Sequence, residues 1–305
     1  MVFLSKQSLH LRRLIVSALF LAAALTVRQF TSFYLPVFGA GGMRVGLSPI
    51  FSIPPALLFG PFYGLLVSGL NDFIGFFLRP TGTYLPHMTI LMAAIGFLRG
   101  IIWPLIKNIS AFKLRIGAII FAAIMLIFAV TTIIMLRIDG IDENFYYGID
   151  YPAEVDTSDM TIMGRFLIVR SQTVSNPTNT LTDTIVNLTR LPIVFAGFFV
   201  VLLIVEFLIS KFLVKTEERQ KALNIMPLLI TMLVTGLIMS TFNTIIIRQH
   251  VFTSWQEMPF VVVWLPRATL NVLTYAVYTY IIAVLMEVCN RVNFIKPLIW
   301  QGFKK

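Results

Sequence analysis

The chain has little of what soluble enzymes and metal proteins use. It contains one cysteine and three histidines among 305 residues, and 12% of its residues are charged. A single cysteine excludes a disulfide framework within the chain and a cysteine-based metal site. Neither a His-Glu-x-x-His nor a Gly-x-Ser-x-Gly motif occurs. We therefore predict a protein that is not an enzyme and holds no cofactor or metal; an enzyme that modifies lipids within the membrane stays as an alternative.

Apolar residues make up most of the chain. They account for 57% of it, and the mean hydropathy is +0.86. This composition is typical of a polytopic membrane protein rather than a soluble globule. The net charge of +10 comes from basic residues that flank the apolar runs. Such flanking charge sets membrane topology, so we do not expect a nucleic-acid partner.

The apolar runs predict about eight membrane spans. A helix needs about 20 residues to cross the hydrocarbon. The second and third runs are shorter and meet at Gly60-Pro61, which predicts a tight helical hairpin. The first run lacks a small-residue cleavage site, so we interpret it as a retained helix. The predicted spans are 13–35, 46–60, 61–78, 86–106, 115–136, 191–213, 225–247 and 261–288.

Lysines predict the orientation of the chain. With both termini in the cytoplasm of a cell whose plasma membrane holds the protein, all nine lysines fall on the cytoplasmic side. The polar segment 137–190 then lies outside and holds eight of the fourteen acidic residues. Its acidic residues could form a calcium site, but the regular ligand spacing of a calcium loop is absent. We therefore favour a solvated extracellular cap.

A polar pair interrupts the third apolar run. Asn71 and Asp72 lie within an apolar run that is expected to span the membrane. A carboxylate there needs an ion pair, a proton or hydrogen bonds. We expect them to satisfy broken backbone or to pair with an arginine such as Arg28 or Arg99. Proton coupling at Asp72, in a secondary transporter with a broken-helix site, is the alternative. Inverted repeats should then be visible, yet no second Leu-Phe-Gly-Pro or Asn-Asp element follows residue 115.

Seven short motifs occur in a recognisable order. They are Arg28, Met43-Arg44-Val45-Gly46, Leu58-Phe59-Gly60-Pro61, Asn71-Asp72, Pro80-Thr81-Gly82-Thr83-Tyr84-Leu85-Pro86, Asn243-Thr244 and Leu265-Pro266-Arg267. In this order the chain resembles the substrate-binding S component of energy-coupling factor (ECF) transporters, and it is most similar to the folate-type subfamily. The resemblance covers residues 11–110 and 225–288.

The resemblance implies an all-helical core of six helices and a set of partners. Such a core captures a vitamin from outside and docks on a membrane scaffold (T) subunit that two ATPase subunits power. The chain lacks a Gly-x-x-x-x-Gly-Lys-Ser/Thr phosphate loop, which agrees with this division. Ala18 and Ala22 match the Ala-x-x-x-Ala patch with which S components contact the scaffold. Packing of these alanines within the chain is the alternative. Membrane lipids are a further expected partner.

The resemblance also implies a ligand site near the outer helix ends. Arginine suits an anionic group, and aromatic rings stack on flat heterocycles, so we expect a folate-like vitamin, with a different vitamin as the alternative. Loops 38–43 and 80–86 are expected to form the gate. Tyr275 is a further candidate for stacking, whereas Tyr278 is expected to anchor at the membrane interface. The expected substrate-binding residues are Arg28, Arg44, Tyr84, His87, Asn243, Trp264 and Arg267.

The chain is longer than the family pattern. Residues 115–214 are expected to be an inserted pair of spans joined by the acidic loop 137–190. They separate the first four core helices, within 11–110, from the last two, within 225–288. Because two spans preserve orientation, the six-helix core can remain intact. A basic cytoplasmic tail, 289–305, follows. His87 is a second departure, because folate-type members carry glycine there.

Overall fold

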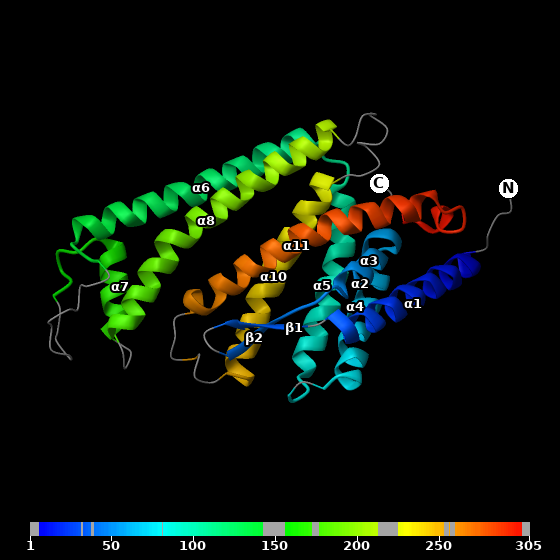
Figure 1. The fold of residues 1–305 in the computed structure, drawn as a ribbon, viewed down its shortest axis with the longest axis horizontal. Coiled ribbons are helices and arrows are strands. Elements are labelled where there is room, and N and C mark those ends of the chain that lie inside the picture. Colours follow the sequence, from blue (N-terminus) through cyan, green and yellow to red (C-terminus); the bar gives the residue numbers. More distant parts are fainter. Residues whose placement is uncertain are drawn as a thin grey trace. The chain divides into compact units, whose positions relative to one another are not determined.

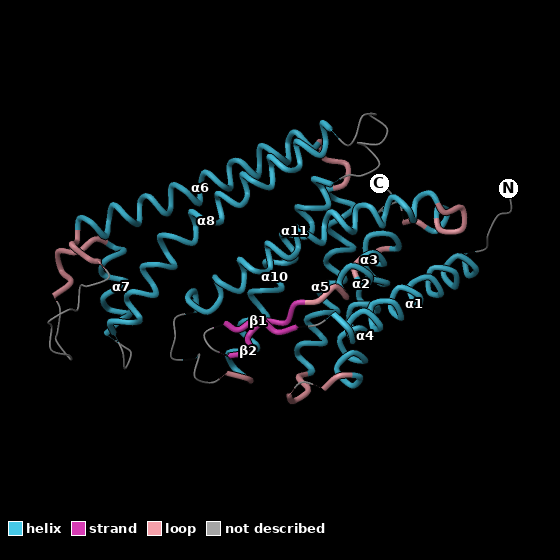
Figure 2. Tube along the Cα trace, viewed as in Figure 1, coloured by secondary structure: helices cyan, strands magenta, loops and turns pink. Residues whose placement is uncertain are grey.

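Helices form most of the structure. The computed structural model describes residues 6–31, 33–37, 40–80, 82–142, 156–172, 177–212, 225–252, 256 and 260–300 (Figures 1 and 2). Within these ranges seven helices are long and apolar enough to cross a membrane. The prediction of a helical, polytopic membrane protein is therefore confirmed. The seven helices are α1 (Lys6–Thr31), α4 (Pro61–Leu78), α5 (Pro86–Ile106), α6 (Ala111–Ile138), α8 (Pro177–Phe212), α10 (Ile225–His250) and α11 (Phe260–Arg291).

The predicted span 46–60 is shorter than expected. It folds as two short helices, α2 (Pro49–Ser52) and α3 (Pro54–Phe59). Together they rise about 16 Å, roughly half the hydrocarbon thickness. Helix α3 ends at Phe59 because Gly60 takes a positive φ of 103° and Pro61 has no N–H to continue the helix. The count of eight full spans is therefore one too high for the described part of the chain.

A β-hairpin follows α1, which the all-helical expectation did not include. Strands β1 (Phe33–Val37) and β2 (Ala40–Val45) pair antiparallel, with Tyr34 opposite Arg44. The backbone alone is described for both strands. Of the expected gate loop 38–43, residues 40–43 belong to β2, and residues 38–39 lie outside the described residues.

The chain divides into two compact units. Unit 1 comprises residues 1–114, 206–246 and 267–305, and unit 2 comprises residues 115–205 and 247–266. Unit 1 thus contains α1 to α5, most of α10 and most of α11. Unit 2 contains most of α6 and α8 together with α7 (Ile162–Gln172). The candidate site described below lies in unit 1.

Small residues bring α4 and α5 into close contact within unit 1. A Cβ on Gly64 would lie 2.6 Å from the Ala56 Cβ and 2.9 Å from the Gly96 carbonyl carbon. A Cβ on Gly100 would clash with the backbone of Pro61. Glycines at such positions let helix backbones approach closely, which is how membrane helices commonly pack. The glycines therefore set the distance between α5 and α4, the helix that carries Asn71 and Asp72.

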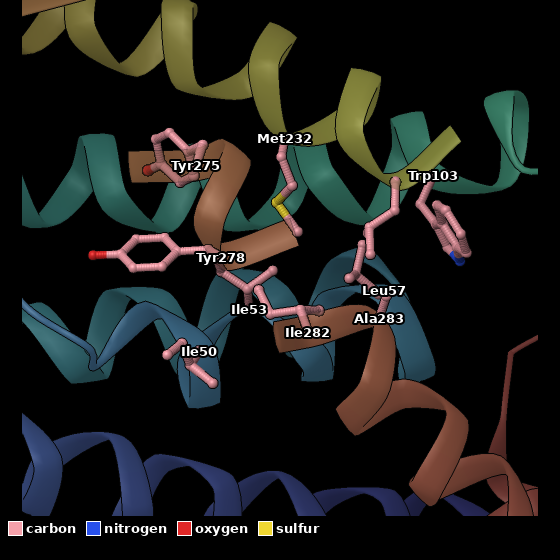
Figure 3. Close-up of a cluster of buried hydrophobic side chains, with 10 residues drawn as sticks. Ile50, Ile53, Leu57, Trp103, Met232, Tyr275, Tyr278, Ile282 and Ala283 are labelled. Atoms are coloured by element: carbon pink, nitrogen blue, oxygen red, sulfur yellow. The ribbon is translucent and has the colours of Figure 1, made fainter. Parts of the chain in front are cut away.

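A buried apolar cluster joins α2, α3, α5, α10 and α11. Figure 3 shows its members, with Met232 of α10 and Ile282 of α11 near Ile53, which lies between α2 and α3, and Leu57 of α3. Ile53, Met232 and Ile282 are fully buried. Since lipid is as apolar as leucine, close packing rather than the hydrophobic effect stabilises this cluster in a membrane.

Unit 2 has a core of its own. Leu136 and Ile141 pack with residues of α7 and α8 that include Leu167, Ile168 and Leu181. The side chain of Asp139 accepts hydrogen bonds from the backbone N–H and the hydroxyl of Thr161, just before α7 begins. The Thr161 hydroxyl in turn accepts the backbone N–H of Gly164, so Thr161 caps α7 and Asp139 holds Thr161 in place. Among the described acidic residues no group of three could hold a metal ion, which leaves the calcium alternative without a described site.

Candidate functional site

An ion pair between a buried arginine and a partly buried aspartate joins α1 to α4. The Nη2 atom of Arg28 lies 3.7 Å from Oδ1 of Asp72, and its Nη1 donates a 2.6 Å hydrogen bond to the carbonyl of Asn71. Arg28 is 8% exposed. Of the two arginines expected near Asp72, Arg28 makes the contact. An arginine and a carboxylate removed from water need one another, because either alone would be a costly buried charge.

Gly75 makes room for the Arg28 side chain, and Ser48 contacts Asn71 beside it. Gly75 lies one turn after Asn71, and a Cβ there would lie 2.6 Å from Cζ of Arg28. The guanidinium therefore crosses α4 over a glycine. Ser48, just before α2, donates its hydroxyl to Oδ1 of Asn71 over 3.2 Å. Asn71 thus contacts Arg28 with its backbone and Ser48 with its side chain.

A chain of hydroxyls continues from Asp72 to the loop between α4 and α5. Tyr84 donates to Oγ1 of Thr89 over 3.0 Å, and Thr89 donates to Oδ2 of Asp72 over 2.8 Å. The Tyr84 ring packs against the rings of Phe73, Phe76 and Phe77, whose centroids lie 5.1 to 5.9 Å away. These contacts hold the loop against the end of α4. The Tyr84 ring is therefore part of an aromatic cluster, which limits the surface it can offer to a ligand.

A second polar group links α10 and α11. Arg267 is 4% exposed, and its Nη2 donates to Oδ1 of Asn243 over 3.1 Å. Its Nε donates to Oγ1 of Thr244 over 3.2 Å. The structure thus brings together two of the predicted substrate-binding residues, Asn243 and Arg267. Pro266 lies within α11 directly before Arg267, so one backbone hydrogen bond of the helix is missing there.

A third polar group in unit 1 links α5 to α10 and α11. Nε of Arg99, on α5, donates to Thr235 of α10 over 3.2 Å, and Nη2 donates to the Tyr275 hydroxyl over 2.8 Å. The guanidinium carbon also lies 5.2 Å from the Tyr275 ring centroid. Tyr275, visible in Figure 3, donates in turn to the sulfur of Met239. Arg99 is therefore a buried link between three helices, and Tyr275 is engaged in that link.

The remaining predicted residues lie on α1, β2, α5 and α11. His87 is the second residue of α5 and is exposed. Trp264 stacks on Phe260, with the ring centroids 6.3 Å apart, and belongs to unit 2. Arg44 lies in β2, and its side chain is outside what the structure describes. Ala18 and Ala22 are exposed on one face of α1.

Tyr278 is not the interface anchor that its residue type suggested. It is 5% exposed and belongs to the apolar cluster in Figure 3. Its hydroxyl donates a 2.5 Å hydrogen bond to the carbonyl of Gly46, between β2 and α2. The positions of tyrosines along a helix do not show whether a given hydroxyl is buried against a backbone carbonyl or lies at the membrane interface. Tyr278 thus ties the hairpin segment to α11.

Comparison with known families adds an independent observation. Residues 9–152 match the family model of the ECF-type riboflavin transporter, S component. This part of the chain is similar to S components. The match covers a little under half of the chain, from α1 through α6, and it supports the S-component resemblance without supporting the folate subtype. No curated protein and no solved structure matches the chain.

Proposed function

We propose that the chain is the substrate-capture subunit of an ECF-type vitamin importer. The observation that carries this proposal is the match of residues 9–152 to the S component of ECF-type riboflavin transporters. In the proposed cycle the subunit binds a vitamin from outside and docks on a scaffold (T) subunit. Two partner ATPases supply the energy, and both termini lie in the cytoplasm of a cell whose plasma membrane holds the complex.

The proposed ligand is a flat heterocyclic vitamin, with riboflavin as the first candidate and a folate as the second. Riboflavin is uncharged at neutral pH, whereas folates carry carboxylates. Arg28, expected from the sequence to contact an anionic ligand, has its charge balanced by Asp72 within the protein. A balanced arginine is a weaker clamp for an incoming carboxylate, because binding must first break or share the existing pair. This favours the neutral ligand.

We assign ligand contact to the residues near the loop that follows α4 and to the group on α10 and α11. Asn243 and Arg267 offer an amide and a guanidinium for the carbonyl and imide groups of a flavin or pterin. Tyr84, Arg44, His87 and Trp264 stay as proposed contacts. Asn71 and Asp72 are assigned a structural role, because Arg28, Ser48 and Thr89 occupy them.

We assign scaffold docking to the face of α1 that carries Ala18 and Ala22. Both alanines are exposed, while Val16, Ala24 and Arg28 of the same helix are buried in unit 1. Small exposed side chains let another membrane helix approach the backbone of α1 closely. Segment 115–214 is proposed to be an inserted helical pair that leaves the six-helix capture core intact.

A titration of the purified chain tests the proposed ligand. Riboflavin and a folate are titrated separately by calorimetry, at low and at high salt. We expect one-to-one binding of riboflavin with nearly the same affinity at both salt concentrations, because a neutral ligand is little affected by screening. A folate as the true ligand would instead bind more weakly as salt increases.

Paired substitutions locate the site. Arg267→Gln should weaken binding by about tenfold or more, because a buried carbonyl of the ligand then loses its guanidinium donor. Arg165→Gln is the matched control, since Arg165 is exposed in unit 2 and donates to the backbone there. Absence of binding for both vitamins, from a chain that unfolds cooperatively, would contradict the proposal. Equal loss in both variants would contradict the assigned site.

A further inference from the structure

The chain turns back after α11 and returns to the beginning of α1. Helix α11 ends at Arg291, and residues 292–300, including the short helix η2 (Lys296–Leu298), follow it. We refer to residues 292–300 as the C-terminal strap. Leu298 is fully buried, in a cluster with Val16 of α1 and with Leu58, Phe59 and Tyr63 at the break between α3 and α4. The strap therefore lies between α1 and that break.

The strap completes the hydrogen bonding of the broken helix. The backbone N–H of Trp300 donates to the carbonyl of Leu58 over 2.6 Å. In a continuous helix that carbonyl would accept the N–H four residues later, but the chain turns at Gly60 and Pro61. A buried carbonyl left without a donor is destabilising, because it has lost its hydrogen bonds to water. Trp300 supplies the donor from a segment that lies far away in sequence.

The Trp300 ring also covers the glycine of the break. A Cβ on Gly60 would lie 3.0 Å from Cδ2 and Cε3 of Trp300. The ring thus packs directly on backbone that only glycine can present in this conformation, with φ at 103°. The indole and the hydrogen bond act on the same turn, so the contact between Trp300 and the break is specific rather than incidental.

Two arginines tie the strap to α1. Nε of Arg13 donates to the carbonyl of Leu298 over 2.7 Å. The guanidinium carbon of Arg12 lies 5.7 Å from the Phe294 ring centroid. Arg13 and Val16 contact the strap from one face of α1, whereas Ala18 and Ala22 are exposed. The strap therefore supports α1 on the side that does not carry the alanines.

We propose that the C-terminal strap is a positioning element that holds α1 against the α3–α4 break, so that the alanine face of α1 is presented to a partner helix in the membrane. This inference rests on the proposed function for the identity of the partner, and on the contacts of Trp300, Leu298 and Arg13 for the strap itself. The strap is distant from the ion pair of Arg28 and Asp72 along α1, so vitamin binding and helix positioning are separable.

The first experiment is amide hydrogen exchange on the purified full chain, and it does not require a partner. Trp300→Ala keeps the backbone N–H that contacts Leu58 but removes the indole that packs on Gly60. It should therefore raise exchange about tenfold in peptides covering residues 9–20 and 54–60, because the strap is no longer fixed on the break. Peptides from α6 and α8 should be unchanged. Lys296→Ala is the matched control, since Lys296 is exposed within the same strap. Unchanged protection of residues 9–20 in Trp300→Ala would overturn the proposal.

The second experiment measures docking, by recovery of the scaffold subunit with the tagged chain. Trp300→Ala should recover about fivefold less scaffold than the unaltered chain or Lys296→Ala, while the riboflavin titration stays within about twofold. Equal recovery by all three chains would overturn the proposed role in docking. If the unaltered chain binds a vitamin but recovers no scaffold, the proposed scaffold partner is wrong. The hydrogen-exchange experiment then tests by itself whether the strap positions α1.

Arg13→Ala provides a second variant in case Trp300→Ala does not fold. It removes one side-chain hydrogen bond and leaves the apolar cluster in place. It should raise exchange in residues 9–20 in the same direction, and the double variant should show less than the product of the two effects, because both act on one contact surface. Independent, multiplicative effects would contradict a single strap.

Discussion

Two glycine-to-alanine substitutions in membrane helices should have opposite effects on stability. In α4, a Cβ on Gly75 would lie 2.6 Å from Cζ and Nε of Arg28, whereas ordinary contact begins at 3.4 Å. In α6, a Cβ on Gly117 would meet nothing within 4 Å. Alanine favours a helix over glycine by up to about 1 kcal/mol, so helix propensity alone predicts that both substitutions stabilise.

The Arg28 contact reverses the sign at Gly75. To make room, the guanidinium must move by roughly 1 Å, which breaks its 2.6 Å hydrogen bond to Asn71 and lengthens the ion pair with Asp72. A hydrogen bond to a charged group contributes about 1.5–3 kcal/mol. After the gain in helix propensity, Gly75→Ala should lower the free energy of unfolding by about 0.5–2 kcal/mol.

The assay is thermal unfolding of the purified chain in one detergent at one scan rate, followed by tryptophan fluorescence. Gly75→Ala should unfold a few degrees lower than the unaltered chain, and Gly117→Ala at the same temperature or higher. Asp72→Asn should cost less in the Gly75→Ala background than alone, because the ion pair is already disturbed there. Gly75→Ala that is as stable as Gly117→Ala would refute the placement of Arg28 over α4.

Three further substitutions test neighbouring contacts. Gly64→Ala should lower the thermal unfolding midpoint in the same assay, because overpacking against α5 costs about 1–3 kcal/mol; an unchanged midpoint would contradict the close approach. Tyr278→Phe should destabilise by about 1 kcal/mol and raise hydrogen exchange around Gly46, and unaltered exchange would contradict their hydrogen bond. Thr89→Val should unfold at a lower temperature than Thr89→Ser, because serine keeps the hydroxyl that contacts Asp72. Equal midpoints would contradict the hydrogen bond between Thr89 and Asp72.

The sequence predicted features that depend on local chemistry. The apolar runs located the long helices because a membrane span needs a minimum length of apolar residues. The break at Gly60-Pro61 was visible because proline cannot donate and glycine allows positive φ. The need of Asp72 for a partner followed from the cost of a buried charge, and Arg28 was one of the two arginines expected there.

Other features depend on which distant segments meet, and the sequence pattern does not state this. Gly75 is one of several glycines in an apolar run, and only the position of Arg28 gives it a role. Tyr278 contacts Gly46, which lies far away in sequence. Since the sequence did not show this partner, Tyr278 was expected to lie at the membrane interface. The β-hairpin at 33–45 was missed because its first residues continue the apolar run 13–35 and because residues 38–43 were expected to form a gate loop.

Mass spectrometry of any small molecule released by denaturing the purified chain tests directly whether the chain captures a vitamin. The chain is expressed alone, purified without added vitamin, and the released compound is quantified against the protein. We expect one vitamin per chain, with riboflavin as the first candidate. A chain that releases no vitamin, and whose thermal unfolding is not raised by riboflavin or by a folate, would contradict its role as a capture subunit.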